Sequence, residues 1–121
     1  MTKKNFHSSF DKTKIKDITL TRDTAYEIND DPLHLVYAMS RYKFVAKMLE
    51  GKKNVLEIGC GDGFKSLIVK KNVQRLYVSD ITDEWQNEVN QFHLNKMFIK
   101  HNFVENSLKM KFDAIFAIDV L

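Results

Sequence analysis

Three glycines at alternate positions, Gly59, Gly61 and Gly63, follow the short apolar segment Asn54-Val55-Leu56-Glu57-Ile58. Glycine tolerates positive φ and leaves the peptide bare, so a ligand can approach the backbone closely. The helix expected after this loop would add free N–H groups and the positive end of its dipole, which suit a carboxylate or a phosphate. The segment from Glu57 to Gly63 is therefore the main candidate for a binding loop.

The glycine spacing disfavours two common cofactor loops. The dinucleotide-binding pattern G-x-G-x-x-G needs a glycine three residues after Gly61, where this sequence has Phe64. The P-loop needs a Gly-Lys-Ser/Thr ending, which is also missing from this segment. The pattern present is E-x-G-x-G-x-G, so a dinucleotide-binding oxidoreductase is disfavoured.

Strand and helix patterns alternate around this loop. Asp31-Pro32 is typical of a helix start, and apolar residues at three- and four-residue steps predict a helix that runs to about Glu50 and ends at Gly51. Helical spacing returns at 64–71 and again after Thr82, the expected cap of a helix that buries Trp85, Val89 and Phe92. Short strands are predicted at 54–58, 76–80, 96–100 and 112–118. This order predicts an α/β fold with a Rossmann-like parallel sheet and flanking helices.

Two regions are expected along the chain. Residues 1–31 are polar and charge-balanced without sustained periodicity, and we interpret them as an N-terminal tail. Residues 32–121 form the expected domain. Its strand at 112–118 is almost continuously apolar, which is typical of an interior strand with neighbours on both edges. We therefore expect the fold to be truncated after the fourth strand, with association through the exposed edge of that strand.

Composition excludes several classes of protein. With 44% apolar and 29% charged residues among 121, the chain can bury a core and is not of the disordered type. Apolar runs are too short to cross a bilayer, and the lone cysteine, Cys60, favours a reducing cytoplasm. The net charge of +3 comes from scattered lysines, so nucleic-acid binding is not expected. The four histidines lack metal-ligand spacing, and no metal site is expected.

Three segments together resemble a known enzyme family. Val55–Gly63 resembles the first motif of class I S-adenosylmethionine-dependent methyltransferases, and Tyr77–Asp80 places an acidic residue at the end of the second strand, as that family does. Lys111–Leu121 resembles its fourth motif. The resemblance covers about Pro32 to Leu121 and implies S-adenosyl-L-methionine as cofactor.

The resemblance also implies a set of cofactor-binding residues: Glu57, Gly59, Cys60, Gly61, Gly63, Asp80, Ile81, Asn102, Phe103 and Asp119. Asp80 would accept hydrogen bonds from the ribose hydroxyls, and Glu57 would hold the methionine end directly or through water. Asp119 would lie beside the amino-acid part of the cofactor.

Other assignments have ordinary structural alternatives. Asn102 and Phe103 would contact adenine, although an Asn after a strand is also a common turn residue. Arg41 and Tyr42 resemble an element that folds over the cofactor carboxylate, but an exposed Arg and a Tyr at the core edge is the favoured interpretation. Cys60 has no neighbouring histidine to activate its thiol, so we expect its backbone to matter more than its sulfur.

By this resemblance the chain would carry the cofactor-binding half of an enzyme that transfers a methyl group to a small-molecule, lipid or saccharide acceptor. No catalytic residue is identifiable. The alternative is a non-catalytic cofactor-binding remnant or interaction domain.

Overall fold

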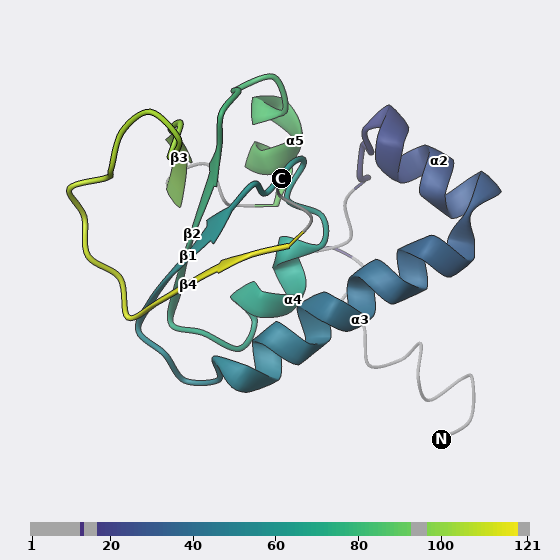
Figure 1. The fold of residues 1–121 in the computed structure, drawn as a ribbon. Helices are drawn as coiled ribbons and strands as arrows, with labels where there is room; N and C mark the ends of the chain where they lie inside the picture. The colour runs from purple at the N-terminus through teal and green to yellow at the C-terminus, as the bar shows by residue number, and fades with distance from the viewer. Residues whose placement is uncertain (1–12, 14–16, 93–96, 119–121) are drawn as a thin grey trace.

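The computed structural model describes residue 13 and residues 17–92 and 97–118. The elements follow in the order α2 (Arg22–Asp30), α3 (Pro32–Met48), β1 (Asn54–Ile58), α4 (Ser66–Lys70), β2 (Arg75–Asp80), α5 (Gln86–Gln91), β3 (Phe98–Lys100) and β4 (Ala114–Ala117) (Figure 1). Each predicted strand is present, with shorter bounds at β3 and β4. The predicted α/β class is confirmed.

The four strands form one parallel sheet in the order β3-β2-β1-β4. The chain adds β2 and β3 on one side of β1 and then returns to place β4 on the other side. In an open parallel sheet, such a reversal of strand order opens a crevice at the carboxyl ends of the strands, where ligands bind. Ile58 and Asp80 end β1 and β2 at this edge of the sheet.

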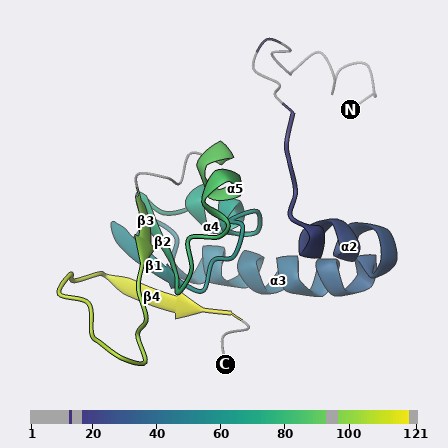
Figure 2. The ribbon, with the colours of Figure 1, turned by 90° about the horizontal axis from the view of Figure 1, so that it is seen from above.

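One face of the sheet carries the main core. Side chains from all three later helices, among them Tyr42 of α3, Val69 of α4 and Val89 of α5, pack with Val55 and Val78 of the two central strands. Figure 2 shows α3 and α4 lying along the same side of the sheet. This burial of apolar surface holds the carboxyl ends of β1 and β2 in register.

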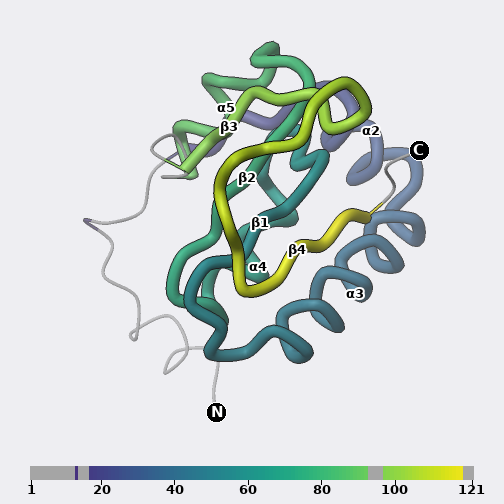
Figure 3. The backbone as a smooth tube through the Cα atoms, turned by 60° about the vertical axis from the view of Figure 1, so that its left-hand side comes forward, coloured from purple at the N-terminus to yellow at the C-terminus, as the bar shows by residue number. Residues whose placement is uncertain are grey.

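The opposite face of the sheet is crossed by the connection between β3 and β4, which passes over β1 and β2 in Figure 3. Phe112 at the end of this connection packs edge-on against Tyr77, with ring centroids 5.4 Å apart. Asp113 then accepts a hydrogen bond from the Asn54 backbone N–H at 2.8 Å, which fixes the start of β4 against β1.

Among the described residues, β4 pairs only with β1, and Ile115 is 56% exposed. Association through this edge stays a prediction. The described residues include no helix with the length and apolar character needed to cross a membrane.

The structure corrects two expectations. Arg22–Asp30 form helix α2 where the sequence predicted no regular element, because Thr21 caps an amphipathic segment of polar composition and also bonds to the glycine loop. Thr82 does not cap α5; its hydroxyl accepts a hydrogen bond from the Glu84 N–H in a turn, and the helix begins four residues later at Gln86. The expected cap at Asp31 is confirmed, since its carboxylate accepts a hydrogen bond from the His34 N–H.

Candidate functional site

The glycine loop connects β1 to α4 and is tied to the end of β2. The backbone N–H groups of Gly59 and Cys60 both donate to the Ser79 carbonyl, at 2.8 and 2.9 Å. Gly61 has a φ of +58°, and a Cβ added there would meet no atom within 4 Å. The loop therefore exposes bare backbone at Gly61, next to open space. The expected helix dipole is weak, because α4 has only five residues.

Asp80 ends β2 beside this loop. One of its carboxylate oxygens accepts a hydrogen bond from the Gly61 N–H at 3.0 Å, and the other accepts one from the Ile81 N–H at 2.8 Å. Each carboxylate oxygen has a second lone pair, so the side chain can still accept hydrogen bonds from a ligand. Asp80 is half-buried and lines a cavity.

Two cavities adjoin the loop, and Gly59 and Gly61 line both of them. The larger, of about 570 Å³, lies over the ends of β2 and β3. The smaller, of about 230 Å³, lies between the loop, α2 and Tyr42 of α3. An elongated ligand with two chemically different ends can therefore occupy both cavities and cross the glycine backbone between them.

The predicted residues of the larger cavity are brought together. Asp80, Ile81, Asn102 and Phe103 all line it, and Ile81 is 68% exposed. The side-chain oxygen of Asn102 accepts a hydrogen bond from the Val104 N–H at 3.0 Å, which is the turn geometry weighed as its alternative. Contact of Asn102 with adenine stays a prediction.

The Phe103 ring lies edge-on to the imidazole of His101, with ring centroids 4.5 Å apart. The backbone N–H of His101 donates to the Asp80 carbonyl at 2.9 Å, so this wall of the larger cavity is joined to β2. His101 lines the cavity as well.

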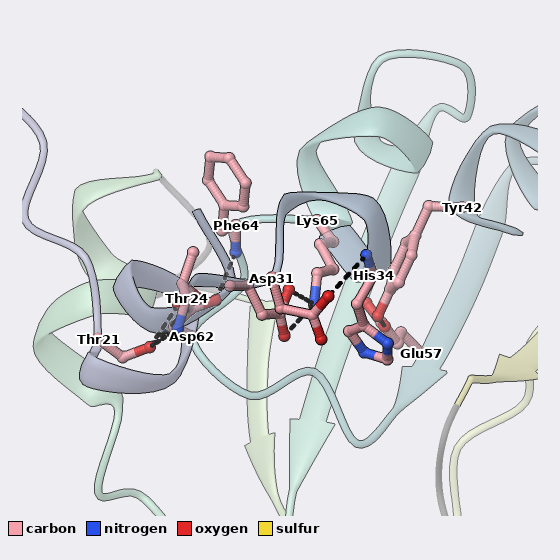
Figure 4. A network of polar contacts seen from close by, with 10 residues as sticks. Thr21, Thr24, Asp31, His34, Tyr42, Glu57, Asp62, Phe64 and Lys65 are labelled. Carbon is pink, nitrogen blue, oxygen red and sulfur yellow. Dashed lines mark hydrogen bonds and ion pairs between the residues drawn. The ribbon is translucent and has the colours of Figure 1, made fainter. Parts of the chain in front are cut away.

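Glu57 has a different position from the one expected. Its side chain is fully buried and lines neither cavity. Its carboxylate accepts hydrogen bonds from the Tyr42 hydroxyl, at 2.5 Å, and from the Ser66 hydroxyl. Burial raises the pKa of Glu57 to about 7, although both hydrogen bonds oppose the shift. Tyr42, which Glu57 orients, does line the smaller cavity (Figure 4).

The sequence did not predict the residues at the start of α2 that line the smaller cavity. The hydroxyls of Thr21 and Thr24 donate to one oxygen of Asp62, at 2.9 and 2.6 Å, while its other oxygen accepts from the Phe64 N–H (Figure 4). The sequence signal was a threonine cap followed by the acidic Asp23 in the first turn. The partner Asp62 is 41 residues from Thr21, which no local pattern reveals.

Three further residues were candidates from the sequence: Cys60, Arg41 and Asp119. Cys60 is buried, and burial together with the nearby negative charges of Glu57 and Asp80 raises the pKa of its thiol. Arg41 is exposed and lines neither cavity. Asp119 lies outside the described residues, within which we find no group of three side chains arranged to hold a metal ion.

Comparison with solved structures identifies the fold. The chain superposes on the N-methyltransferase NodS from Bradyrhizobium japonicum, solved with S-adenosyl-L-homocysteine, with a TM-score of 0.59 and 19% identity over 74% of this chain. It also matches the Trypanosoma brucei PRMT1 enzyme-prozyme complex with AdoHcy, at 27% identity and a TM-score of 0.47, over 78% of this chain and 31% of that one. No protein-family model and no curated sequence matches the chain significantly.

The likeness to NodS shows that the chain has the class I S-adenosylmethionine-dependent methyltransferase fold. The chain spans 47% of the NodS chain, so the likeness covers about half of that protein.

Proposed function

We propose that this chain binds S-adenosyl-L-methionine across the glycine loop, with the adenosine in the larger cavity and the amino-acid end in the smaller one. The main observation that supports this proposal is that Gly59 and Gly61 line both cavities, while Asp80 lines the larger one. The cofactor has two such ends joined at a sulfonium, so the donor set and the division of space fit it. The fold shared with NodS, which was solved with S-adenosyl-L-homocysteine, supports the same cofactor class.

Each part of the site has a role in this proposal. Asp80 accepts hydrogen bonds from the ribose hydroxyls, and Ile81 and Phe103 provide apolar contact for the adenine ring. The bare peptide of Gly61 allows close approach at the centre. Cys60 contributes its backbone, and Gly63 ends the loop through an N–H bond to the Cys60 carbonyl at 3.1 Å. When bound, the cofactor supplies an activated methyl group on its sulfonium.

The proposed reaction is transfer of this methyl group to a small-molecule, lipid or saccharide acceptor, a choice made from the Asp-Val-Leu ending of the fourth-motif resemblance. The chain's own contribution is alignment of the cofactor and exclusion of water from its amino-acid end. We assign no catalytic base. The single cysteine supports a cytoplasmic location as part of the proposal.

A second candidate is binding of the cofactor without catalysis. On this proposal residues 32–121 form the cofactor-binding domain with the same site residues, and no methyl group is transferred.

Titration calorimetry with S-adenosylmethionine, S-adenosylhomocysteine and NAD tests the binding proposal. We expect both adenosyl ligands to bind and NAD not to bind, because the glycine spacing lacks the dinucleotide pattern. Absence of heat with either adenosyl ligand would contradict it. A turnover assay against a panel of small-molecule, lipid and saccharide acceptors then separates the two candidates, because only the enzyme transfers methyl groups.

A further inference from the structure

The smaller cavity has an ion pair in its wall. The ammonium of Lys65, which precedes α4, lies 3.1 Å from one carboxylate oxygen of Glu27 in α2 and donates a hydrogen bond to the other at 3.2 Å. Both residues line the cavity, and their side chains are only 22% and 19% exposed. Partial burial leaves such charges less screened than a surface pair, so they interact strongly with charges on a ligand.

Helix α2 is fixed against the glycine loop beside this ion pair. Thr21 and Thr24 bond to Asp62, and the Thr19 backbone exchanges two hydrogen bonds with the Gln91 side chain of α5. Since these contacts join three separate parts of the chain, Glu27 is held at the cavity by the fold and not by its local sequence.

The polar residues of this wall suit a zwitterion. An α-amino acid carries an ammonium and a carboxylate on one carbon, so it is complementary to a carboxylate and an ammonium held side by side. Among the described residues that line the smaller cavity, Lys65 is the only cationic side chain, while Asp23, Glu27 and Asp62 are acidic. Asp62 already accepts three hydrogen bonds, which leaves Glu27 better able to accept from a ligand.

We propose that Glu27 and Lys65 form the α-amino-acid subsite of this chain, with Glu27 receiving the ligand's ammonium and Lys65 its carboxylate. This inference rests on the proposed function and deepens it. It assigns the amino-acid end to residues of α2 and the loop, in place of Glu57 and Arg41. The carboxylate of Glu57 is buried and already bonded to Tyr42 and Ser66, and Arg41 lines neither cavity.

Three adenosyl ligands whose sulfur carries no charge distinguish the contact with Glu27 from the contact with Lys65. S-adenosylhomocysteine carries both the ammonium and the carboxylate, its decarboxylated form carries only the ammonium, and 5′-methylthioadenosine carries neither. Calorimetry on the 121-residue chain should find 5′-methylthioadenosine at least tenfold weaker than S-adenosylhomocysteine. Equal affinity of these two ligands would overturn the subsite without any variant.

Two variants then test the roles of Glu27 and Lys65 separately. Glu27→Gln should weaken S-adenosylhomocysteine and its decarboxylated form about tenfold and leave 5′-methylthioadenosine unchanged. Lys65→Met should weaken S-adenosylhomocysteine alone. Asp30→Asn on α2 and Lys43→Met on α3, both exposed positions away from the cavities, serve as matched controls and should change none of the three affinities.

The outcomes distinguish this inference from the proposed function. If no adenosyl ligand binds the unaltered chain, the proposed function itself fails. If the ligands bind but Glu27→Gln weakens all three equally, Glu27 has a structural role and the subsite assignment is wrong. Unchanged affinity for S-adenosylhomocysteine in both variants would also overturn the subsite. In each variant, the affinity for 5′-methylthioadenosine shows whether the adenosine end of the site remains folded.

Discussion

The Asp80 carboxylate accepts a hydrogen bond from the Gly61 backbone N–H at 3.0 Å, which joins the end of β2 to the centre of the glycine loop. A single side chain thus shapes the loop and faces the larger cavity. The two motif residues that the sequence singled out separately form one unit in the structure. Loss of this carboxylate therefore affects both the loop and the ligand.

Asp80→Ala should weaken binding of S-adenosylhomocysteine by about 1–3 kcal/mol, because charge-assisted hydrogen bonds to the ribose hydroxyls are lost. Calorimetry measures this change. Asp83→Ala is the matched control, since Asp83 lines neither cavity and its 3.7 Å ion pair with Lys100 is exposed. Equal affinities for Asp80→Ala and the unaltered chain would remove Asp80 from the site.

Gly61→Ala should lower both stability and ligand affinity. An alanine at φ +58° costs about 1 kcal/mol of folding free energy, and its methyl group points into open space that the ligand is proposed to use. Gly51→Ala provides the control, because Gly51 also has positive φ and open space but lies outside both cavities. Thermal melts should show similar losses for the two variants, and calorimetry should show weaker binding for Gly61→Ala alone. Unchanged affinity of Gly61→Ala would contradict close approach at this residue.

The buried Glu57 should make stability fall as pH rises from about 4.5 towards 7. Its folded pKa of about 7 lies above the ordinary value of 4.5, so the folded protein binds a proton that the unfolded chain releases across this range. The full effect is about 3 kcal/mol, reached above pH 7. Glu57→Gln stays uncharged and can still bond to Tyr42 and Ser66, so it should be more stable than the unaltered chain at pH 8 and similar at pH 4.5.

Denaturant unfolding of both proteins between pH 4.5 and pH 8 measures that difference. Parallel pH profiles would contradict the raised pKa. Glu57→Ala distinguishes charge from contact, because it should be less stable than Glu57→Gln at every pH: it leaves a cavity and two buried hydroxyls without their partner.

Cys60 should resist alkylation in the folded protein. Its side chain is 7% exposed, and the raised thiol pKa leaves little thiolate at pH 7.5. Mass spectrometry after iodoacetamide treatment should find unmodified protein under native conditions and a single adduct in urea. Rapid native modification would show that the thiol is accessible and ionised.

Sequence patterns predicted the parts of this structure that depend on local order. The apolar run of β1, the alternate glycines and the acidic end of β2 lie next to one another in the fold because parallel strands place their carboxyl ends at one edge. The start of α3 at Pro32 followed from the Asp31 cap. These signals are contained within a few residues each.

The missed features depend on contacts between distant residues. Thr21 and Asp62 are 41 residues apart, and Tyr42 and Glu57 are 15 apart on different elements. Helix α2 is amphipathic but polar overall, and the residues that its first turn contacts in the glycine loop lie far away in the sequence. For the same reason Glu57 was expected at the ligand, whereas Tyr42 and Ser66 enclose it.

The location of the adenosyl ligand is tested most directly by nuclear magnetic resonance. In a titration of the isotopically labelled chain with S-adenosylhomocysteine, we expect shifts in the amide signals of Gly59, Gly61, Ile81 and residues 101–104, with the Gly51 amide unaffected. Such a pattern places the ligand across the glycine loop. Binding without shifts at Gly61 and Ile81 would contradict the central claim that bare backbone and the Asp80 carboxylate hold the cofactor.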